Sequence, residues 1–354
     1  MRIMIGIGHP KQVHIWKNIV KNLIEDGHEI KILATDKDVA VDLLDVYGFD
    51  YETYGRRTNS LAKKAYGLVG HTLNALSVAK NFKPDILIAG TPYLAYVSKI
   101  LRKPHIMITD TEHANLVYWL TYPFTDVIIT PSCFKGRINP KKHVAFDGYF
   151  ELAYLHPNYF TPDPSVLDDV GLSEDDKFII IRFVAWEASH DVGQSGINND
   201  MAVEYISKLE RYARVFISSE VKLGSDFEKY KLKIPPEKFH SLLSYAELYI
   251  GESGAISAEA GILGVPSVYV SSLVGTMGNF DELEERYGLV YSFQDSKLAL
   301  DNALELLEDK NTHTKWQKKR GKMLDEKMDV TKFMTEFIED HPDSFEKYKQ
   351  RCGT

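Results

Sequence analysis

Residues 1–34, MRIMIGIGHPKQVHIWKNIVKNLIEDGHEIKILA, contain the pattern from which the class of fold follows. An apolar run over residues 1–7 predicts a buried strand, a helix pattern follows over residues 13–26, and residues 29–34 predict a second strand. Gly27 stands where the end of a helix requires a residue that tolerates positive φ. Strand, glycine turn, helix and strand within about 35 residues predict a βαβ unit with a parallel sheet.

The alternation of apolar strands with amphipathic helices continues along the chain and predicts sheets covered on both faces. A stretch rich in proline and acidic residues, 158–176, interrupts it and is the predicted linker. The expected strands are residues 1–7, 29–34, 86–89, 105–109 and 127–130 before this linker, and 178–184, 215–218, 248–250 and 267–270 after it.

These patterns predict an α/β fold of two doubly wound, Rossmann-like domains that face a central cleft, where the carboxyl ends of such strands bind ligands. The N-terminal domain is expected over residues 1–157 and the second domain over residues 177–329. Residues 330–354 are expected to form a C-terminal helix that crosses back to the first domain.

Composition narrows the classes of function. With 354 residues, of which 44% are hydrophobic and 26% charged, the chain can form two cores, and its net charge of −8 argues against a nucleic acid partner. Two distant cysteines, Cys133 and Cys352, favour a reducing compartment and argue against a zinc site. No run approaches the roughly 20 apolar residues of a membrane span, and no secretory signal pattern is present. We therefore expect a cytoplasmic protein.

The strongest local motif is YIGESGAISAEA over residues 249–260. A strand ends there, small residues form a turn and a helix begins, so the first backbone amides of the helix and the Ser253 hydroxyl can bind an anion. Glu259 lies about one helical turn further on, where a carboxylate can accept hydroxyls such as those of a ribose. The alternative is a capped turn whose Gly254 and Gly261 serve close packing.

Residues 252–260, ESGAISAEA, resemble the DSGG-x-x-E-E segment of the non-hydrolysing UDP-N-acetylglucosamine 2-epimerases. They also resemble the matching segment of the N-acetylglucosaminyltransferase that forms lipid II. The architecture of both families is GT-B, in which this segment holds the UDP. The resemblance implies nucleotide-sugar binding by the loop and helix, with the glutamate at the ribose. The residues so implicated are Glu252, Ser253, Gly254, Ala255 and Glu259, and Ala258 replaces the first of the epimerases' two glutamates.

Two further segments are similar to the transferase. Residues 110–113, DTEH, resemble its HEQN run, and residues 275–279, GTMGN, resemble its Q-x-x-N loop, which implies that Asn279 lies near the donor. Asp110 and Glu112 are candidate catalytic carboxylates because such groups at the end of a buried strand are costly unless they are used or paired. The alternative is that Asp110 or Thr111 caps the next helix.

The turn after the first strand, GIGHPKQVH over residues 6–14, is the position of GGTGGH in the transferase. Gly8 is a candidate for nucleotide-sugar binding there. His9 and His14 are candidate bases because an imidazole titrates near neutral pH, and the alternative for each is a hydrogen-bonded turn residue.

Arg182 and His190, which flank the end of the first strand of the second domain, are candidates for phosphate binding. The H-R-R-E-N motif that the epimerases carry near this point is absent, which argues against epimerisation. The run YGRRTNSLAKKAY over residues 54–66 is basic and amphipathic, so it can attract an anionic lipid or a phosphorylated acceptor, or be a solvated loop and helix start. The residues expected at a membrane surface are Arg56, Arg57, Lys63 and Lys64.

Three functions remain open. The first is a metal-independent GT-B glycosyltransferase that moves a sugar from a UDP-sugar to an acceptor, lipid-linked in one version, with no cofactor. The second is an isomerase like the UDP-N-acetylglucosamine 2-epimerases, and the third is a non-catalytic nucleotide-binding protein. The chain also resembles a GT-B-like family that is mainly uncharacterised and archaeal, which implies a fold more than a reaction. We identify no D-x-D motif in the strand context of a GT-A site, no Walker motif and no complete G-x-G-x-x-G, so GT-A, ATP and NAD chemistry are not expected.

Overall fold

The structure is a computed structural model that describes residues 1–36, 38–56, 61–184, 199–219 and 225–351. The chain divides into two compact units. Unit 1 comprises Met1–Tyr154 and Met328–Thr354, and unit 2 comprises Leu155–Lys327. Residues 158–176, predicted as a linker, therefore belong to unit 2.

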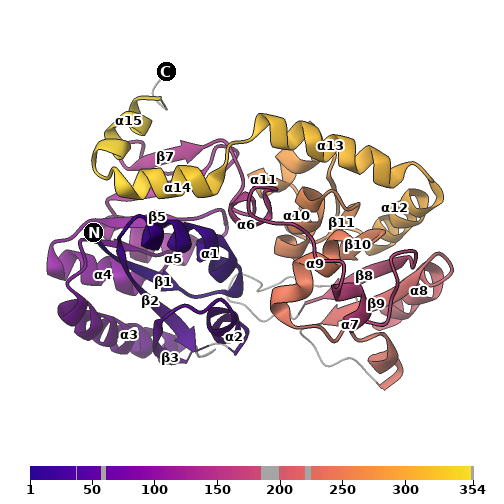
Figure 1. The fold of residues 1–354 in the computed structure, drawn as a ribbon, viewed down its shortest axis with the longest axis horizontal. Coiled ribbons are helices and arrows are strands. Elements are labelled where there is room, and N and C mark those ends of the chain that lie inside the picture. The colour runs from indigo at the N-terminus through magenta and orange to yellow at the C-terminus, as the bar shows by residue number, and fades with distance from the viewer. Residues whose placement is uncertain (37, 57–60, 185–198, 220–224, 352–354) are drawn as a thin grey trace. The chain divides into compact units, whose positions relative to one another are not determined.

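Unit 1 contains, within its described residues, a parallel sheet with the strand order β3-β2-β1-β4-β5-β6-β7 (Figure 1). The strands are β1 (Arg2–Ile7), β2 (Glu29–Asp36), β3 (Tyr51–Arg56), β4 (Ile86–Ile88), β5 (His105–Ile108), β6 (Val127–Pro131) and β7 (His143–Phe146). The helices before the passage to unit 2 are α1 (Pro10–Glu25), α2 (Asp38–Val46), α3 (Leu61–Phe82), α4 (Pro92–Leu101), α5 (Asn115–Thr121), η1 (Tyr122–Phe124) and α6 (Leu152–Leu155).

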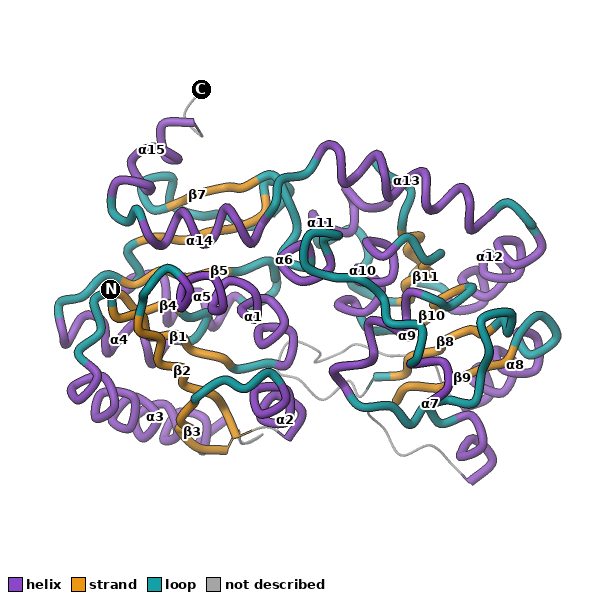
Figure 2. Tube along the Cα trace, viewed as in Figure 1, coloured by secondary structure: helices purple, strands orange, loops and turns teal. Residues whose placement is uncertain are grey.

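The core of unit 1 forms because its strands are apolar on both faces. Met4, Leu33 and Leu87 from three neighbouring strands pack with Leu94 of α4 and Ala79 of α3. In Figure 2 the strands run between helices in each unit, which is the arrangement expected for a sheet covered on both sides.

The C-terminal helices, α14 (Val330–Glu339) and α15 (Asp343–Arg351), belong to unit 1. The Thr331 hydroxyl donates to the Ala153 carbonyl at 2.7 Å, and the Phe333 ring stacks on Phe146 of β7 at a centroid distance of 5.4 Å. Figure 1 shows both helices, in yellow, beside β7. The amphipathic α14 thus buries its apolar face on the N-terminal part of the chain.

Unit 2 contains, in the part that the structure describes, a parallel sheet ordered β12-β11-β10-β8-β9. The strands are β8 (Phe178–Phe183), β9 (Arg214–Ser219), β10 (Leu248–Gly251), β11 (Ser267–Val270) and β12 (Val290–Phe293). The helices are α7 (Val166–Asp169), α8 (Asn199–Leu209), η2 (Ser225–Tyr230), η3 (Pro236–Lys238), α9 (Phe239–Ser244), α10 (Gly254–Leu263), α11 (Gly278–Asp281), η4 (Glu282–Arg286), α12 (Ser296–Glu308) and α13 (Thr312–Glu326).

The predicted strands are present in both units, and β3, β7 and β12 lie outside the prediction. All three are edge strands, with a neighbour on one side only among the strands that the structure describes, so they do not need the continuous apolar run of a central strand. Helix α1 begins at Pro10 rather than near Val13, because His9 caps it and proline fits its first turn. Gly27 has a φ of +85°, as expected at a helix end.

The buried His105 at the start of β5 makes folding dependent on pH. Burial lowers the pKa of its imidazole from 6.5 to about 3. The folded chain therefore keeps His105 neutral, whereas the unfolded chain protonates it below pH 6.5. This contribution to stability is complete above pH 6.5 and is lost as the pH falls toward 3.

We predict that His105 alone lowers the free energy of unfolding by about 2 kcal/mol between pH 7 and pH 5. Urea unfolding at both pH values measures this fall in the free energy of unfolding. In His105→Gln the fall between pH 7 and pH 5 should be about 2 kcal/mol smaller than in the parent chain. His313→Gln, which changes an exposed histidine, is the control and should keep the parent's pH dependence. Equal pH dependence in His105→Gln and the parent would contradict this assignment.

Candidate functional site

The amino-terminal end of α10 in unit 2 forms a turn suited to an anion. The central strand β10 ends at Gly251, and Ser253 caps α10 with its Oγ 3.5 Å from the backbone nitrogen of Ile256. The backbone amides of Gly254 and Ala255, in the first turn, have no carbonyl one turn earlier in the helix to bond with. The helix dipole adds partial positive charge at the same point.

Gly251 and Glu252 hold the ends of two strands together beside this turn. A Cβ at Gly251 would lie 2.5 Å from the Arg182 carbonyl oxygen, so only glycine allows β10 to approach β8 this closely. The buried Glu252 carboxylate accepts a hydrogen bond from the Val184 amide at 3.1 Å. The structure thus gives Glu252, predicted as a ligand-binding residue, a role in joining strand ends.

Arg182 lies beside Gly251 in the sheet, near the end of β8. Its Nη1 donates to the Ser218 hydroxyl of β9 at 2.6 Å. This bond anchors the half-buried guanidinium at the carboxyl edge of the sheet. Its neighbouring candidate, His190, lies outside the described residues.

Glu259 is buried, with 5% of its surface exposed, and its carboxylate lies against the imidazole of His240 of α9. The distance from Glu259 Oε1 to His240 Nε2 is 3.2 Å, and His240 is buried as well. Glu259 is predicted from the sequence but His240 is not, because a single histidine in FHSLLS carries no motif. The pairing holds the carboxylate on the face of α10 toward α9.

Asn279 and Gly254 meet different parts of a small aromatic cluster. Asn279 Oδ1 accepts a hydrogen bond from the Phe280 amide at 3.0 Å. The Phe280 ring stacks on the Tyr269 ring with a centroid distance of 4.4 Å. A Cβ at Gly254 would lie 3.4 Å from the Tyr269 hydroxyl and 3.5 Å from the Phe280 ring. At Gly261 a Cβ would come within 2.8 Å of Val290, so close packing explains that glycine.

Unit 1 has a cluster of three charged side chains at the carboxyl edge of its sheet. Lys11 Nζ, in the first turn of α1, lies 2.6 Å from Asp110 Oδ2 and 2.8 Å from Glu151 Oε1. Glu151 is buried, whereas 19% of the Asp110 side chain is exposed. Asp110 was a predicted catalytic residue, but Lys11 and Glu151 were not predicted. Only the fold brings these three residues together.

Burial and charge act in opposite directions on this cluster. Burial lowers the pKa of Lys11, but the carboxylates of Asp110 and Glu151 outweigh it and raise this pKa above its ordinary value. Burial raises the pKa of Glu151, and the Lys11 ammonium opposes that change. Lys11 is therefore a fixed cation that holds the Asp110 carboxylate in place.

The other candidates near this edge have local partners. The Gly8 amide donates to Gln12 Oε1 at 2.7 Å, and the Nδ1 of the exposed His9 caps α1 by accepting from the Lys11 amide at 3.2 Å. His14 lies within α1 instead of in the turn, is 7% exposed, and has Nδ1 3.1 Å from the Tyr47 hydroxyl. A general base must reach solvent or substrate, so the buried His14 is a weaker candidate for the base than the exposed His9.

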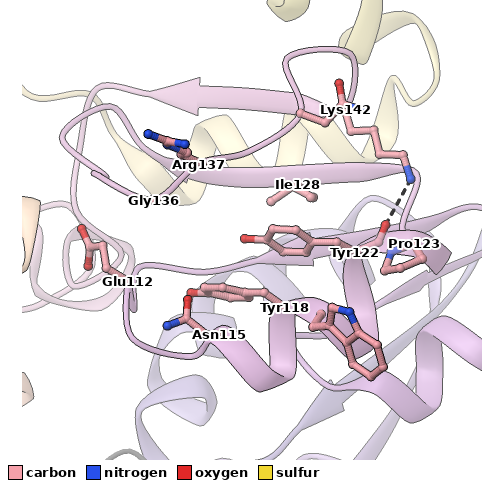
Figure 3. A pocket seen from close by; sticks show the side chains of 11 residues that line it. Glu112, Asn115, Tyr118, Tyr122, Pro123, Ile128, Gly136, Arg137 and Lys142 are labelled. Atoms are coloured by element: carbon pink, nitrogen blue, oxygen red, sulfur yellow. Dashed lines mark hydrogen bonds between the residues drawn. The ribbon is translucent and has the colours of Figure 1, made fainter.

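Glu112 and Asp110 contact different partners. Glu112 Oε1 accepts a hydrogen bond from the Lys135 amide at 3.1 Å, and Glu112 lines a cavity beside α5 (Figure 3). The residue that caps α5 is Ala114, so the alternative in which Asp110 or Thr111 caps this helix is wrong. The two carboxylates thus have different partners within unit 1.

The predicted membrane residues lie in or beside a segment whose side chains the structure does not describe. Arg57 is outside the described residues, and for Arg56, Lys63 and Lys64 only the backbone is described. Among the helices that the structure covers, none is both long and apolar enough to span a membrane. Within the described ranges, no group of three or more His, Cys, Asp or Glu side chains is arranged to hold a metal ion.

Comparison with protein families gives a match over most of the chain. The family model described as "Protein of unknown function (DUF354)" matches residues 1–341. An uncharacterized protein of Methanocaldococcus jannaschii, MJ0665, is 25% identical over 289 residues, which are 77% of this chain and 83% of that protein.

Solved structures show the same architecture at low sequence identity. The UDP-GlcNAc 2-epimerase of Neisseria meningitidis bound to UDP-GlcNAc has a TM-score of 0.67 at 15% identity, with 96% of this chain and 99% of that chain covered. The glycosyltransferase VinC in complex with dTDP has a TM-score of 0.62 at 12% identity, with coverages of 96% and 99%. The likeness shows the fold, which is α/β of the GT-B type with two Rossmann-like domains.

We predict that Lys11→Met lowers the free energy of unfolding by about 3 to 5 kcal/mol at pH 7, since it leaves buried negative charge without a partner. Urea unfolding measures this loss. The double variant Lys11→Met/Glu151→Gln should recover part of it, because the buried charge is then removed. Lys21→Met, on the same helix but with its side chain 70% exposed, is the matched control and should cost less than about 1 kcal/mol. Equal losses in the two lysine variants would show that the cluster does not stabilise unit 1.

Proposed function

The chain belongs to the family described as "Protein of unknown function (DUF354)", and we propose that it is a metal-independent glycosyltransferase that uses a UDP-sugar. The observation that carries this proposal is the turn between β10 and α10, where a capped helix start and a buried glutamate follow the central strand of unit 2. A helix start of this kind binds phosphate.

In this proposal unit 2 binds the nucleotide. The amides of Gly254 and Ala255 and the Ser253 hydroxyl bind the diphosphate, and Glu259 accepts the ribose hydroxyls. His240 keeps the Glu259 carboxylate on one side of α10, because its Nε2 lies 3.2 Å from Glu259 Oε1. Amides aimed at the diphosphate also stabilise the charge that develops on it as it leaves, which a metal ion would otherwise do. Arg182 and Asn279 are further candidates for contact with the donor.

Asp110 of unit 1 is the proposed base. Lys11 fixes one oxygen of its carboxylate at 2.6 Å, and the side chain keeps some exposure at the sheet edge. The carboxylate removes the proton of an acceptor hydroxyl. The hydroxyl oxygen then bonds to the anomeric carbon of the sugar, and the bond from that carbon to the UDP oxygen breaks, so that UDP leaves with the electron pair.

The second candidate is an isomerase that acts on a UDP-sugar. It is favoured by the fold similarity to a UDP-GlcNAc 2-epimerase and by the carboxylates Asp110, Glu112 and Glu151 of unit 1. Conversion of UDP-GlcNAc to an epimer without any acceptor would establish this reaction instead of transfer. Nucleotide binding with no turnover, even when a cell extract supplies acceptors, would support the non-catalytic alternative.

We predict that UDP at about 100 times its Kd raises the free energy of unfolding by about 2.7 kcal/mol. Glu259→Gln should weaken UDP binding by about 10-fold or more, because a charged acceptor for the ribose hydroxyls is lost. A thermal-shift titration with nucleotides and nucleotide-sugars measures both effects. Glu305→Gln changes an exposed carboxylate of unit 2 and should bind UDP as the parent does. Absence of stabilisation by any nucleotide would rule out the proposal.

We predict that Asp110→Asn lowers the rate of sugar transfer by about 100- to 10,000-fold, the usual contribution of a general base. UDP affinity should stay unchanged, because the nucleotide is assigned to unit 2. The assay follows UDP release from UDP-sugars in the presence of cell-extract acceptors. Glu112→Gln is the matched variant, and a loss of rate in Glu112→Gln with normal rates in Asp110→Asn would move the base to Glu112.

A further inference from the structure

Unit 1 contains a cavity of about 630 Å³ beside α5, which we call the tyrosine pocket (Figure 3). Tyr118 and Tyr122 line it together with Trp119, and segment 136–142 closes its other side. Its volume lies within the range of about 300 to 1,000 Å³ that is typical of small-molecule sites. Apart from Glu112, which is a candidate base, none of the residues that line the pocket is assigned to the nucleotide site or to catalysis.

The wall of the pocket is aromatic. The rings of Tyr118 and Tyr122 stack with a centroid distance of 4.8 Å and an interplanar angle of 20°. Trp119 is 75% exposed and lies at the pocket. A tryptophan left in water loses the free energy that burial of its ring would give, so an indole in this place is suited to stack on a ligand.

A buried hydroxyl accompanies these rings. The Tyr122 oxygen is shielded from solvent, and no hydrogen-bond partner for it is present within the described part of the chain. Burial also raises the pKa of Tyr122, so the phenol stays protonated and can donate. A buried hydroxyl without a partner has lost its hydrogen bonds to water, and a ligand with hydroxyl groups would restore them.

The hydroxyl is directed toward the polar end of the pocket. Figure 3 shows the Tyr122 oxygen pointing to the side of the pocket that carries Glu112 and Arg137. Lys142 stabilises the backbone beside the pocket, because its Nζ donates to the carbonyls of Tyr122 at 3.1 Å and Thr125 at 2.6 Å.

The charges at this end select for a neutral ligand. Glu112 is an acceptor and would repel an anion, whereas Arg137 is a donor and would repel a cation. A neutral ring with several hydroxyls satisfies both, since each hydroxyl can donate and accept. A pyranose has such hydroxyls on its edge and C–H groups on its faces, which match an aromatic wall.

We propose that the tyrosine pocket binds a neutral pyranose ring. The binding of this ring does not depend on the proposed function. Its identity as part of the acceptor in sugar transfer rests on that function. Trp119 stacks on one face of the ring, Tyr122 donates to a ring hydroxyl, and Glu112 and Arg137 contact the remaining hydroxyls.

The test uses the full chain labelled with 5-fluorotryptophan, followed by ¹⁹F NMR. Four tryptophans give four signals, and Trp119→Phe identifies the signal of Trp119. Titration with methyl β-D-glucopyranoside and methyl N-acetyl-β-D-glucosaminide should move this signal saturably, whereas cyclohexanol and inorganic phosphate should not. Tyr122→Phe should weaken glycoside binding by about 5- to 10-fold, because one hydrogen bond is lost.

Trp119→Ala, read out by saturation-transfer NMR on the glycoside protons, should weaken binding as well. It changes an exposed side chain, so the fold stays intact. Leu73→Ala changes another exposed apolar residue of unit 1, away from the pocket, and should bind glycoside normally. The proposal is overturned if no glycoside moves the Trp119 signal, if Tyr122→Phe binds as tightly as the parent, or if cyclohexanol or phosphate produces the same shift.

A separate UDP titration keeps the two proposals apart. Glycoside binding without UDP binding would leave the tyrosine pocket in place and remove the proposed transfer. UDP binding without glycoside binding would overturn the tyrosine pocket and leave the nucleotide site in place.

Discussion

Parallel strands that are buried on both faces leave one place for polar chemistry, the edge where the strands end. Both units of this chain obey that constraint. In unit 1 the charged cluster of Lys11, Asp110 and Glu151 lies at this edge, and in unit 2 the turn after β10 lies there. The apolar strands also fix these positions, because a shift of register would bury charge within the sheet.

The two edges differ in how they are built. Unit 2 uses the backbone: a glycine that allows close approach of two strands, a serine cap and the first amides of a helix. Unit 1 uses side chains whose charges offset one another in a buried setting, an arrangement that is costly to assemble but fixes geometry. Backbone amides suit an anion of constant charge, and a carboxylate held by a lysine suits proton removal. The proposed reaction needs both, one for the diphosphate and one for the acceptor hydroxyl.

The central strands and the α10 turn could be predicted from the sequence, since both depend on neighbours along the chain. The strands β3, β7 and β12 could not, because they lack a continuous apolar run. The side chains that contact the predicted residues could not be predicted from the sequence either. His240 meets Glu259, and Lys11 meets Glu151, only after folding, and no spacing marks such pairs. The same holds for the tyrosine pocket, whose walls come from α5 and a loop beyond β6.

The central claim is that the start of α10 binds the diphosphate of a nucleotide, and amide hydrogen exchange with and without UDP tests it most directly. UDP is expected to slow exchange in peptides covering residues 252–259, where the Gly254 and Ala255 amides would donate to phosphate. Binding of UDP without protection of this segment, or with protection confined to unit 1, would contradict it.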